Sequence, residues 1–82
     1  MANLENLEKY NNAFCESLET QPDKLAGLKY QDIEAWDSVG HMRLIAAIEE
    51  AFDIMMETDD IIDLSSYEHG KEILSQKYDV EF

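Results

Sequence analysis

A serine hydroxyl beside a carboxylate marks the point where a loop is expected to become an amphipathic helix. The two residues are Asp37 and Ser38, inside the stretch Trp36–Met42. A helix start has unpaired backbone N–H groups and the positive end of the helix dipole, which together favour a phosphate esterified to a serine there. The same position also suits an ordinary helix cap. The residues therefore indicate either an attachment site or a cap.

His41, three residues after Ser38, could act as a general base for a serine nucleophile. However, no Gly-x-Ser-x-Gly turn surrounds Ser38, and the only other histidine is His69. No carboxylate relay or oxyanion hole is evident around the pair. The two histidines and the single Cys15 also lack the spacing of metal ligands. We therefore expect a protein that is not itself an enzyme and has no metal site.

Charge further restricts the function. Nineteen acidic residues against six basic ones give a formal charge of -13, which argues against nucleic acid as a partner. No Lys or Arg occurs between Arg43 and Lys71, although acidic residues are frequent there. This half of the chain suits proteins with basic surfaces, and it also suits a solvated face kept soluble by like charge.

Length and hydropathy indicate one small domain. The 82 residues can build only one thin core. The lone cysteine fits a reducing compartment, and no signal-peptide apolar block is present near the start. The longest apolar run, Leu44–Ile48, is too short to enter a bilayer. We expect a cytoplasmic monomer without membrane insertion.

The periodicity predicts an all-α fold, a small four-helix bundle without strands. Apolar residues at spacings of three and four predict a first helix at about 4–19 and a second at about 38–52. A long loop at about 20–37 joins them. A short third helix is expected at about 59–64 and a fourth at about 66–78. The expected core consists of Leu7, Phe14, Ile45, Ile48, Phe52, Ile61, Leu64 and Leu74.

Polar residues before each of the last three helices predict how they begin. Asp37 is expected to cap the second helix. Thr58, followed by two aspartates, is expected to cap the third. Ser65 with Glu68 three residues later matches a capping box for the fourth.

Several of these stretches together resemble the acyl carrier protein family. Asp37–Val39 is similar to the family's Asp-Ser-Leu attachment motif, and Ile48–Ile54 resembles the end of its second helix. Asp59–Leu64 corresponds to the family's short acidic third helix. The likeness covers most of the chain from about Ile33 onward, whereas residues 1–20 match only in pattern.

The resemblance implies that a phosphopantetheinyl transferase joins 4'-phosphopantetheine from coenzyme A to Ser38. Acyl groups would then be carried as thioesters on the thiol of the arm and presented to acyl-loading and acyl-transfer enzymes with basic surfaces. Asp37 would help to bind the magnesium of the transferase during loading. An aminoacyl or peptidyl carrier would share this chemistry with different cargo. An unmodified acidic helical adaptor that binds a basic protein is the alternative from another class.

The resemblance also implies partner-facing positions on the second helix. They are Val39, Met42, Arg43, Ala46, Glu49 and Glu50. Met42 can equally be a core residue. Arg43 stands where fatty-acid members of the family commonly carry an acid, so we hypothesise a dedicated pathway rather than housekeeping fatty-acid synthesis. Gly40 departs from the family pattern too, and either a close approach of the arm or a partner, or tolerance of the first helical turn, would explain it.

Five further residues align with or near positions that shelter an acyl chain in the family. They are Ile48, Met56, Ile61, Leu64 and Tyr67. Ordinary core packing is the alternative explanation for these apolar side chains. The sequence leaves both explanations open.

Overall fold

Four α-helices form the regular structure of residues 4–82, the part of the chain that the computed structural model describes. They are α1 (Leu4–Leu18), α2 (Ser38–Phe52), α3 (Thr58–Asp63) and α4 (Tyr67–Lys77). No strand occurs among these residues, which confirms the prediction of a small helical fold. Each helix end lies within one residue of the predicted end. None of these helices is long and apolar enough to cross a membrane.

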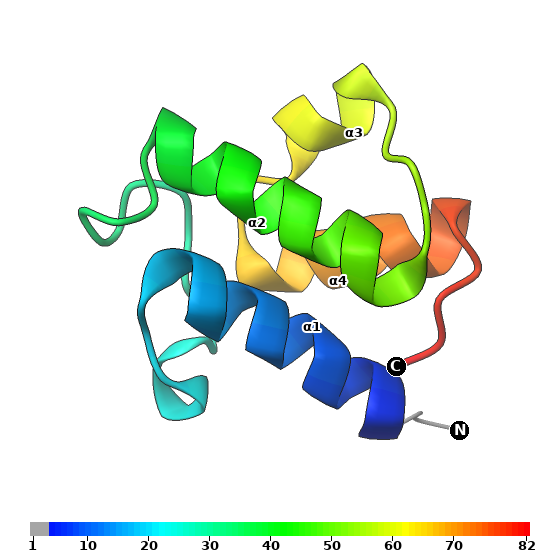
Figure 1. Ribbon diagram of the computed structural model, residues 1–82, viewed down its shortest axis with the longest axis horizontal. Coiled ribbons are helices and arrows are strands. Elements are labelled where there is room, and N and C mark those ends of the chain that lie inside the picture. Colours follow the sequence, from blue (N-terminus) through cyan, green and yellow to red (C-terminus); the bar gives the residue numbers. More distant parts are fainter. Residues whose placement is uncertain (1–3) are drawn as a thin grey trace.

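The helices α1 and α2 lie side by side and run in opposite directions (Figure 1). In this view α3 lies on the side of α2 away from α1, and α4 passes behind α2. The segment that joins α1 to α2 includes one turn of 3-10 helix at Pro22–Lys24. An isolated antiparallel bridge between Lys29 and Ser66 attaches this segment to the start of α4. The predicted loop of about 20–37 is therefore tied to the rest of the fold.

The core contains most of the predicted residues but extends beyond them. Phe14, Ile45, Ile48, Leu64 and Leu74 are buried as predicted. The prediction was wrong for Leu7, Phe52 and Ile61, which are only partly buried because they lie at the margin of the packed helices. The largest additions are Trp36 and Tyr10, both 0% exposed.

Aromatic rings join α1 to the later parts of the chain. The Phe14 ring centroid lies 5.4 Å from that of Trp36 and 5.3 Å from that of Tyr67, both edge to face. The Tyr10 hydroxyl donates to the backbone oxygen of Tyr67 at 2.7 Å, and burial raises the pKa of this phenol. Gly70 leaves room for the hydroxyl, because a Cβ there would lie 2.1 Å from it. These contacts fix α1 against α4.

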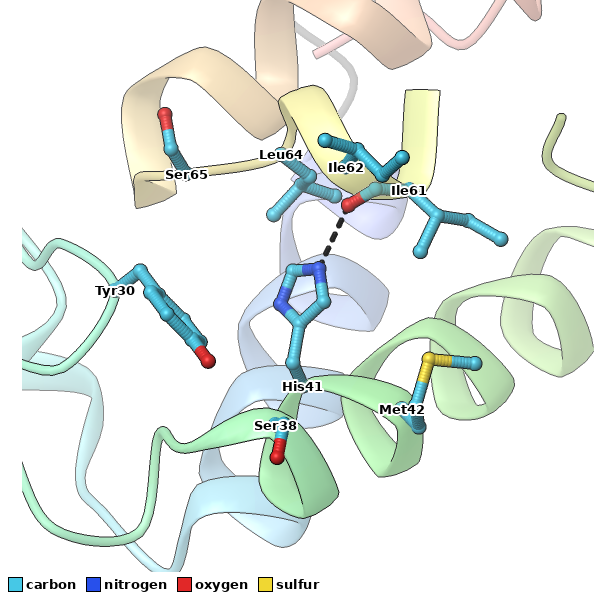
Figure 2. Close-up of a pocket in the computed structure, with 8 residues that line it drawn as sticks. All are labelled: Tyr30, Ser38, His41, Met42, Ile61, Ile62, Leu64 and Ser65. Carbon is cyan, nitrogen blue, oxygen red and sulfur yellow. Dashed lines mark hydrogen bonds between the residues drawn. The ribbon is translucent and has the colours of Figure 1, made fainter. Parts of the chain in front are cut away.

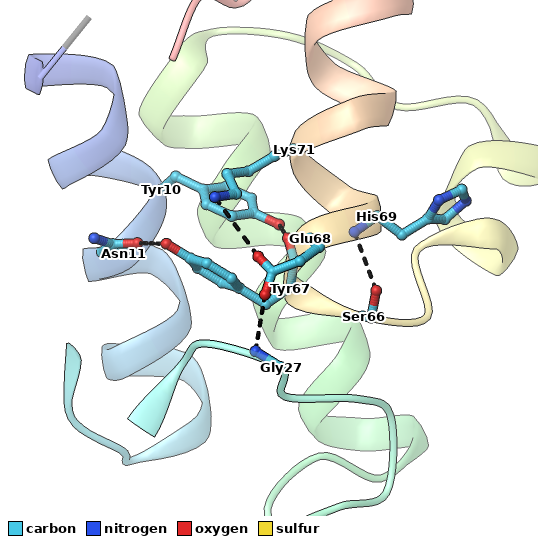
Figure 3. A network of polar contacts seen from close by, with 8 residues as sticks. All are labelled: Tyr10, Asn11, Gly27, Ser66, Tyr67, Glu68, His69 and Lys71. Carbon is cyan, nitrogen blue, oxygen red and sulfur yellow. Dashed lines mark hydrogen bonds and ion pairs between the residues drawn. The ribbon is translucent and has the colours of Figure 1, made fainter. Parts of the chain in front are cut away.

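Polar contacts at the start of α4 fix the connecting segment (Figure 3). Ser66, not Ser65, caps the helix by accepting from the His69 N–H at 3.0 Å. The predicted capping box is wrong because the Glu68 carboxylate accepts instead from the Gly27 N–H at 2.8 Å. The displaced Ser65 accepts through its backbone oxygen from the Tyr30 N–H. The contact of Glu68 with Gly27, distant in the sequence, therefore takes the place of the predicted local contact between Glu68 and Ser65.

The short helix α3 is held through a buried carboxylate. Thr58 is its first residue rather than its cap, and the capping position is occupied by Glu57 without a side-chain hydrogen bond. Asp60, which is 1% exposed, pairs with the Lys77 ammonium at 2.6 Å and accepts from the Tyr78 hydroxyl at 2.7 Å. These hydrogen bonds lower the pKa of Asp60 and join α3 to the end of α4.

We predict that Asp60→Asn reduces the acid sensitivity of folding. Because the pKa of Asp60 is lower in the folded state, its charge stabilises the fold above the unfolded pKa of about 4. This contribution is lost as the pH falls through the folded pKa. The gap in unfolding free energy between wild type and variant should therefore narrow from pH 6 to pH 3 in urea titrations. Asp59→Asn, at an exposed neighbour, is the control, and a constant gap for Asp60→Asn would contradict the prediction.

Candidate functional site

The segment before Ser38 is anchored by the indole of Trp36. This side chain is 0% exposed and packs against Phe14. Its backbone N–H donates to the Ile33 oxygen at 3.1 Å, and its backbone oxygen accepts from the Gln31 N–H at 3.1 Å. The chain therefore enters α2 from a fixed point rather than from a free loop.

The first turn of α2 presents the Ser38 hydroxyl to solvent. Asp37 is the N-cap, as predicted, and its carboxylate accepts from the Gly40 N–H at 2.8 Å. Ser38 is the first residue of the helix and is exposed. Within residues 4–82 its hydroxyl makes no hydrogen bond, because Asp37 supplies the capping oxygen. The hydroxyl is therefore accessible from solvent and is not engaged by another group of the described residues.

Gly40 is required by a close approach of the backbone. A Cβ on this buried residue would lie 1.8 Å from the Ala35 backbone oxygen, well inside contact distance. The segment before Trp36 therefore passes directly against the first turn of α2. The sequence had suggested a close approach of the arm or a partner, or tolerance of the first helical turn. The structure shows a different reason, because the closely approaching atoms belong to the backbone of the chain itself.

The imidazole of His41 is tied on both of its nitrogens. Its Nδ1 accepts from the Trp36 indole N–H at 3.0 Å, and its Nε2 lies 2.7 Å from the Ile61 backbone oxygen. Because the indole can only donate, Nδ1 carries no proton and Nε2–H donates to Ile61. Neither nitrogen is available to take a proton from Ser38. The geometry therefore argues against His41 as a general base that activates Ser38.

A pocket of about 330 Å³ opens beside Ser38, between α2 and α3 (Figure 2). Apolar side chains form much of its wall, and the hydroxyl-bearing residues Tyr30, Ser38 and Ser65 also line it. Its volume is at the lower end of the range of about 300–1,000 Å³ for small-molecule sites. The lining residues are Tyr30, Ser38, His41, Met42, Ile61, Ile62, Leu64 and Ser65.

Only two of the five predicted acyl-chain residues line this pocket. Ile61 and Leu64 contribute to its wall. Ile48, Met56 and Tyr67 belong instead to the packed core, at 0%, 7% and 7% exposure. Sequence reasoning missed Tyr30, Ile62 and Ser65 as lining residues, because their positions depend on how the connecting segment and α3 fold back onto α2.

The predicted partner-facing positions on α2 are mostly exposed. Val39 is 61% exposed and Met42 is 54% exposed, which excludes Met42 from the core. Arg43, Ala46 and Glu50 are also exposed. Glu49 is different, because its carboxylate accepts from the Met56 N–H at 2.9 Å and so holds the segment after α2. Whether these positions bind a partner stays a prediction.

The residues around Ser38 fit a phosphate-linked arm. The hydroxyl is exposed and unbonded at the start of a 15-residue helix, where a phosphodiester would meet the positive end of the helix dipole. The adjacent pocket offers an apolar surface. Within residues 4–82, no group of three or more His, Cys, Asp or Glu side chains is placed to hold a metal ion.

Comparison of this chain with protein-family models, with curated proteins and with solved structures finds no match. The functional interpretation therefore depends on the residues and geometry of the site.

We predict that Gly40→Ala destabilises the protein and disturbs the Ser38 site. A methyl group would displace the Ala35 backbone, and overpacking of this kind costs typically 1–3 kcal/mol, partly offset by about 1 kcal/mol of helix propensity. A lower urea midpoint and a changed Trp36 emission spectrum are the expected results. The neighbouring Val39→Ala, at an exposed position, should change neither. Equal stability of Gly40→Ala and wild type would contradict the close approach.

Proposed function

We propose that this protein is a carrier protein that bears 4'-phosphopantetheine on Ser38 and delivers acyl groups to partner enzymes. The observation that carries the proposal is the exposed, unbonded Ser38 hydroxyl at the start of α2, at the edge of an apolar pocket. The resemblance of Asp37–Val39 and of the following helix to acyl carrier proteins supports it. When bound, the arm supplies a thiol to which acyl cargo is joined as a thioester.

Each nearby residue has a defined task in this proposal. Ser38 provides the oxygen that is joined to phosphate. Asp37 caps α2 through one carboxylate oxygen, which leaves its other oxygen for the magnesium of a phosphopantetheinyl transferase. Trp36 and Gly40 hold the helix start in place. The burial of Trp36 and the close approach at Gly40 thus set the position of the backbone that bears the serine.

The surface around Ser38 supports recognition by basic partners. No Lys or Arg follows Arg43 until Lys71, and Glu50 is exposed on α2. Exposed Val39 and Met42 add apolar contact area near the serine. An aminoacyl or peptidyl carrier would use the same surface with other cargo, whereas an unmodified adaptor would have no use for the free hydroxyl of Ser38.

Loading tests the proposal directly. We expect incubation with coenzyme A, magnesium and a broad-specificity phosphopantetheinyl transferase to add one phosphopantetheine, measured by intact mass. Ser38→Ala should gain nothing. The matched control is Ser65→Ala, which removes another exposed serine from the same pocket and should load like wild type. If wild type gains no mass while a known carrier is loaded in parallel, the unmodified adaptor is favoured.

Arg43 should bias the choice of partner. Its guanidinium is exposed and has no ion pair within the described residues, so it is free to meet an acid on a partner. A housekeeping fatty-acid condensing enzyme with a basic surface should therefore use Arg43→Glu faster than wild type, by about tenfold in kcat/KM.

The control is Arg43→Lys, which keeps the charge and should behave like wild type. Equal kcat/KM values for Arg43→Glu and wild type would contradict a role for this charge in partner choice.

A further inference from the structure

We propose that His41 is a specificity-determining residue that limits the length of the cargo group sheltered beside Ser38. This inference rests on the proposed function and deepens it, because it names a cargo class: short acyl groups rather than long alkyl chains. Its basis is the position of the imidazole, which stands between α2 and α3 with Tyr30 on one side and Met42 on the other (Figure 2).

The imidazole is fixed by contacts on every side that faces the protein. Its two nitrogens are hydrogen-bonded to Trp36 and to the Ile61 backbone oxygen, at 3.0 and 2.7 Å. Its plane lies 16° from that of the Trp36 indole, with 6.2 Å between centroids. The Tyr30 ring packs edge to face against it at 5.6 Å. A side chain held in this way acts as a wall and does not swing aside freely.

The interior beyond this wall is filled. Trp36, whose indole N–H donates to the imidazole, is 0% exposed, and so are Leu44 and Ile48 of the core. None of these three residues lines the pocket. A group that enters beside Ser38 therefore meets His41, Ile61 and Leu64, which line the pocket, before it can reach Trp36, Leu44 or Ile48.

A cargo group longer than the pocket must either stay in solvent or displace the imidazole. Displacement would break both hydrogen bonds and leave the buried indole N–H without an acceptor, which is unfavourable. Short groups gain apolar contact with Met42, Ile61 and Ile62 without this cost. The wall thus favours short groups at this site.

The length of alkyl group that the pocket shelters can be measured without a transferase, by attaching alkyl groups directly at position 38. In a Ser38→Cys/Cys15→Ala variant, the introduced thiolate displaces methanesulfinate from alkyl methanethiosulfonates and forms a mixed disulfide with the alkanethiol. A series from methyl to dodecyl would be attached in this way. The melting temperature should rise with each buried methylene and level off before dodecyl, once the group fills the pocket. Emission of Trp36, the only tryptophan, should stay unchanged throughout the series.

Adding His41→Ala to this variant should open the pocket toward Trp36. The rise in melting temperature should then continue to longer alkyl groups, and the longer groups should change the Trp36 emission. If His41→Ala does not fold, His41→Asn, which is smaller than imidazole and still polar, should shift the limit in the same direction. The control is His69→Ala, because His69 is the other histidine of the chain and lies on α4. This variant should stop gaining stability at the same alkyl length as the protein with His69 intact. Two results would overturn the inference. In the first, the melting temperature of the variant with His41 intact keeps rising through dodecyl. In the second, the melting temperature of a folded His41→Ala or His41→Asn variant stops rising at the same alkyl length as that of the protein with His41 intact.

The same limit should appear on the loaded protein. On the holo form, thioesters of short acyl groups are expected to react with hydroxylamine about fivefold more slowly than thioesters of long ones. This ratio corresponds to a free-energy difference of about 1 kcal/mol, similar to the net contribution of one hydrogen bond. His41→Ala should abolish this difference, and an unchanged difference would overturn the inference.

The proposed carrier function and the proposed role of His41 can fail independently of each other. Absence of any adduct on Ser38 refutes the proposed carrier function, whereas the alkyl series decides the role of His41 regardless of loading.

Discussion

The hydrogen bonds from Trp36 to His41 and from His41 to Ile61 connect the three parts of the protein that form the site. The indole is buried in the aromatic core, the imidazole belongs to the first turns of α2, and the accepting oxygen belongs to α3. Because an indole can only donate, the first bond fixes the imidazole tautomer and thereby the direction of the second. The position of α3 relative to Ser38 depends on this chain of bonds.

The remaining parts of the fold hold this arrangement from behind. Phe14 of α1 packs on Trp36, and the Tyr10 hydroxyl joins α1 to α4. Asp60 secures the far side of α3 through Lys77 and Tyr78. A six-residue helix has little stability of its own, since helix nucleation is unfavourable and short helices are marginal in water. Buried polar contacts at both sides of α3 compensate for its length.

Local patterns predicted α1, α2 and α4 well because these helices have apolar residues at helical spacing over several turns. The start of α2 was correct because the Asp37 carboxylate bonds within its own turn, a contact that sequence spacing describes fully. The start of α4 was misplaced by one residue. There the Glu68 carboxylate had a local and a distant donor available, and the distant Gly27 N–H prevailed. Sequence spacing contains no information about such competition.

The sequence by itself determined the helical fold, the acidic character and the serine at the Asp37-capped helix start, because these follow from composition and from contacts within one turn. The tertiary structure alone decided that Gly40 accommodates the Ala35 backbone and that His41 is a wall rather than a base. It also decided which residues line the pocket, with Ile48, Met56 and Tyr67 in the core and Tyr30, Ile62 and Ser65 in the pocket lining. These features depend on contacts between segments distant in the chain, whose geometry is set by the packing of the whole core.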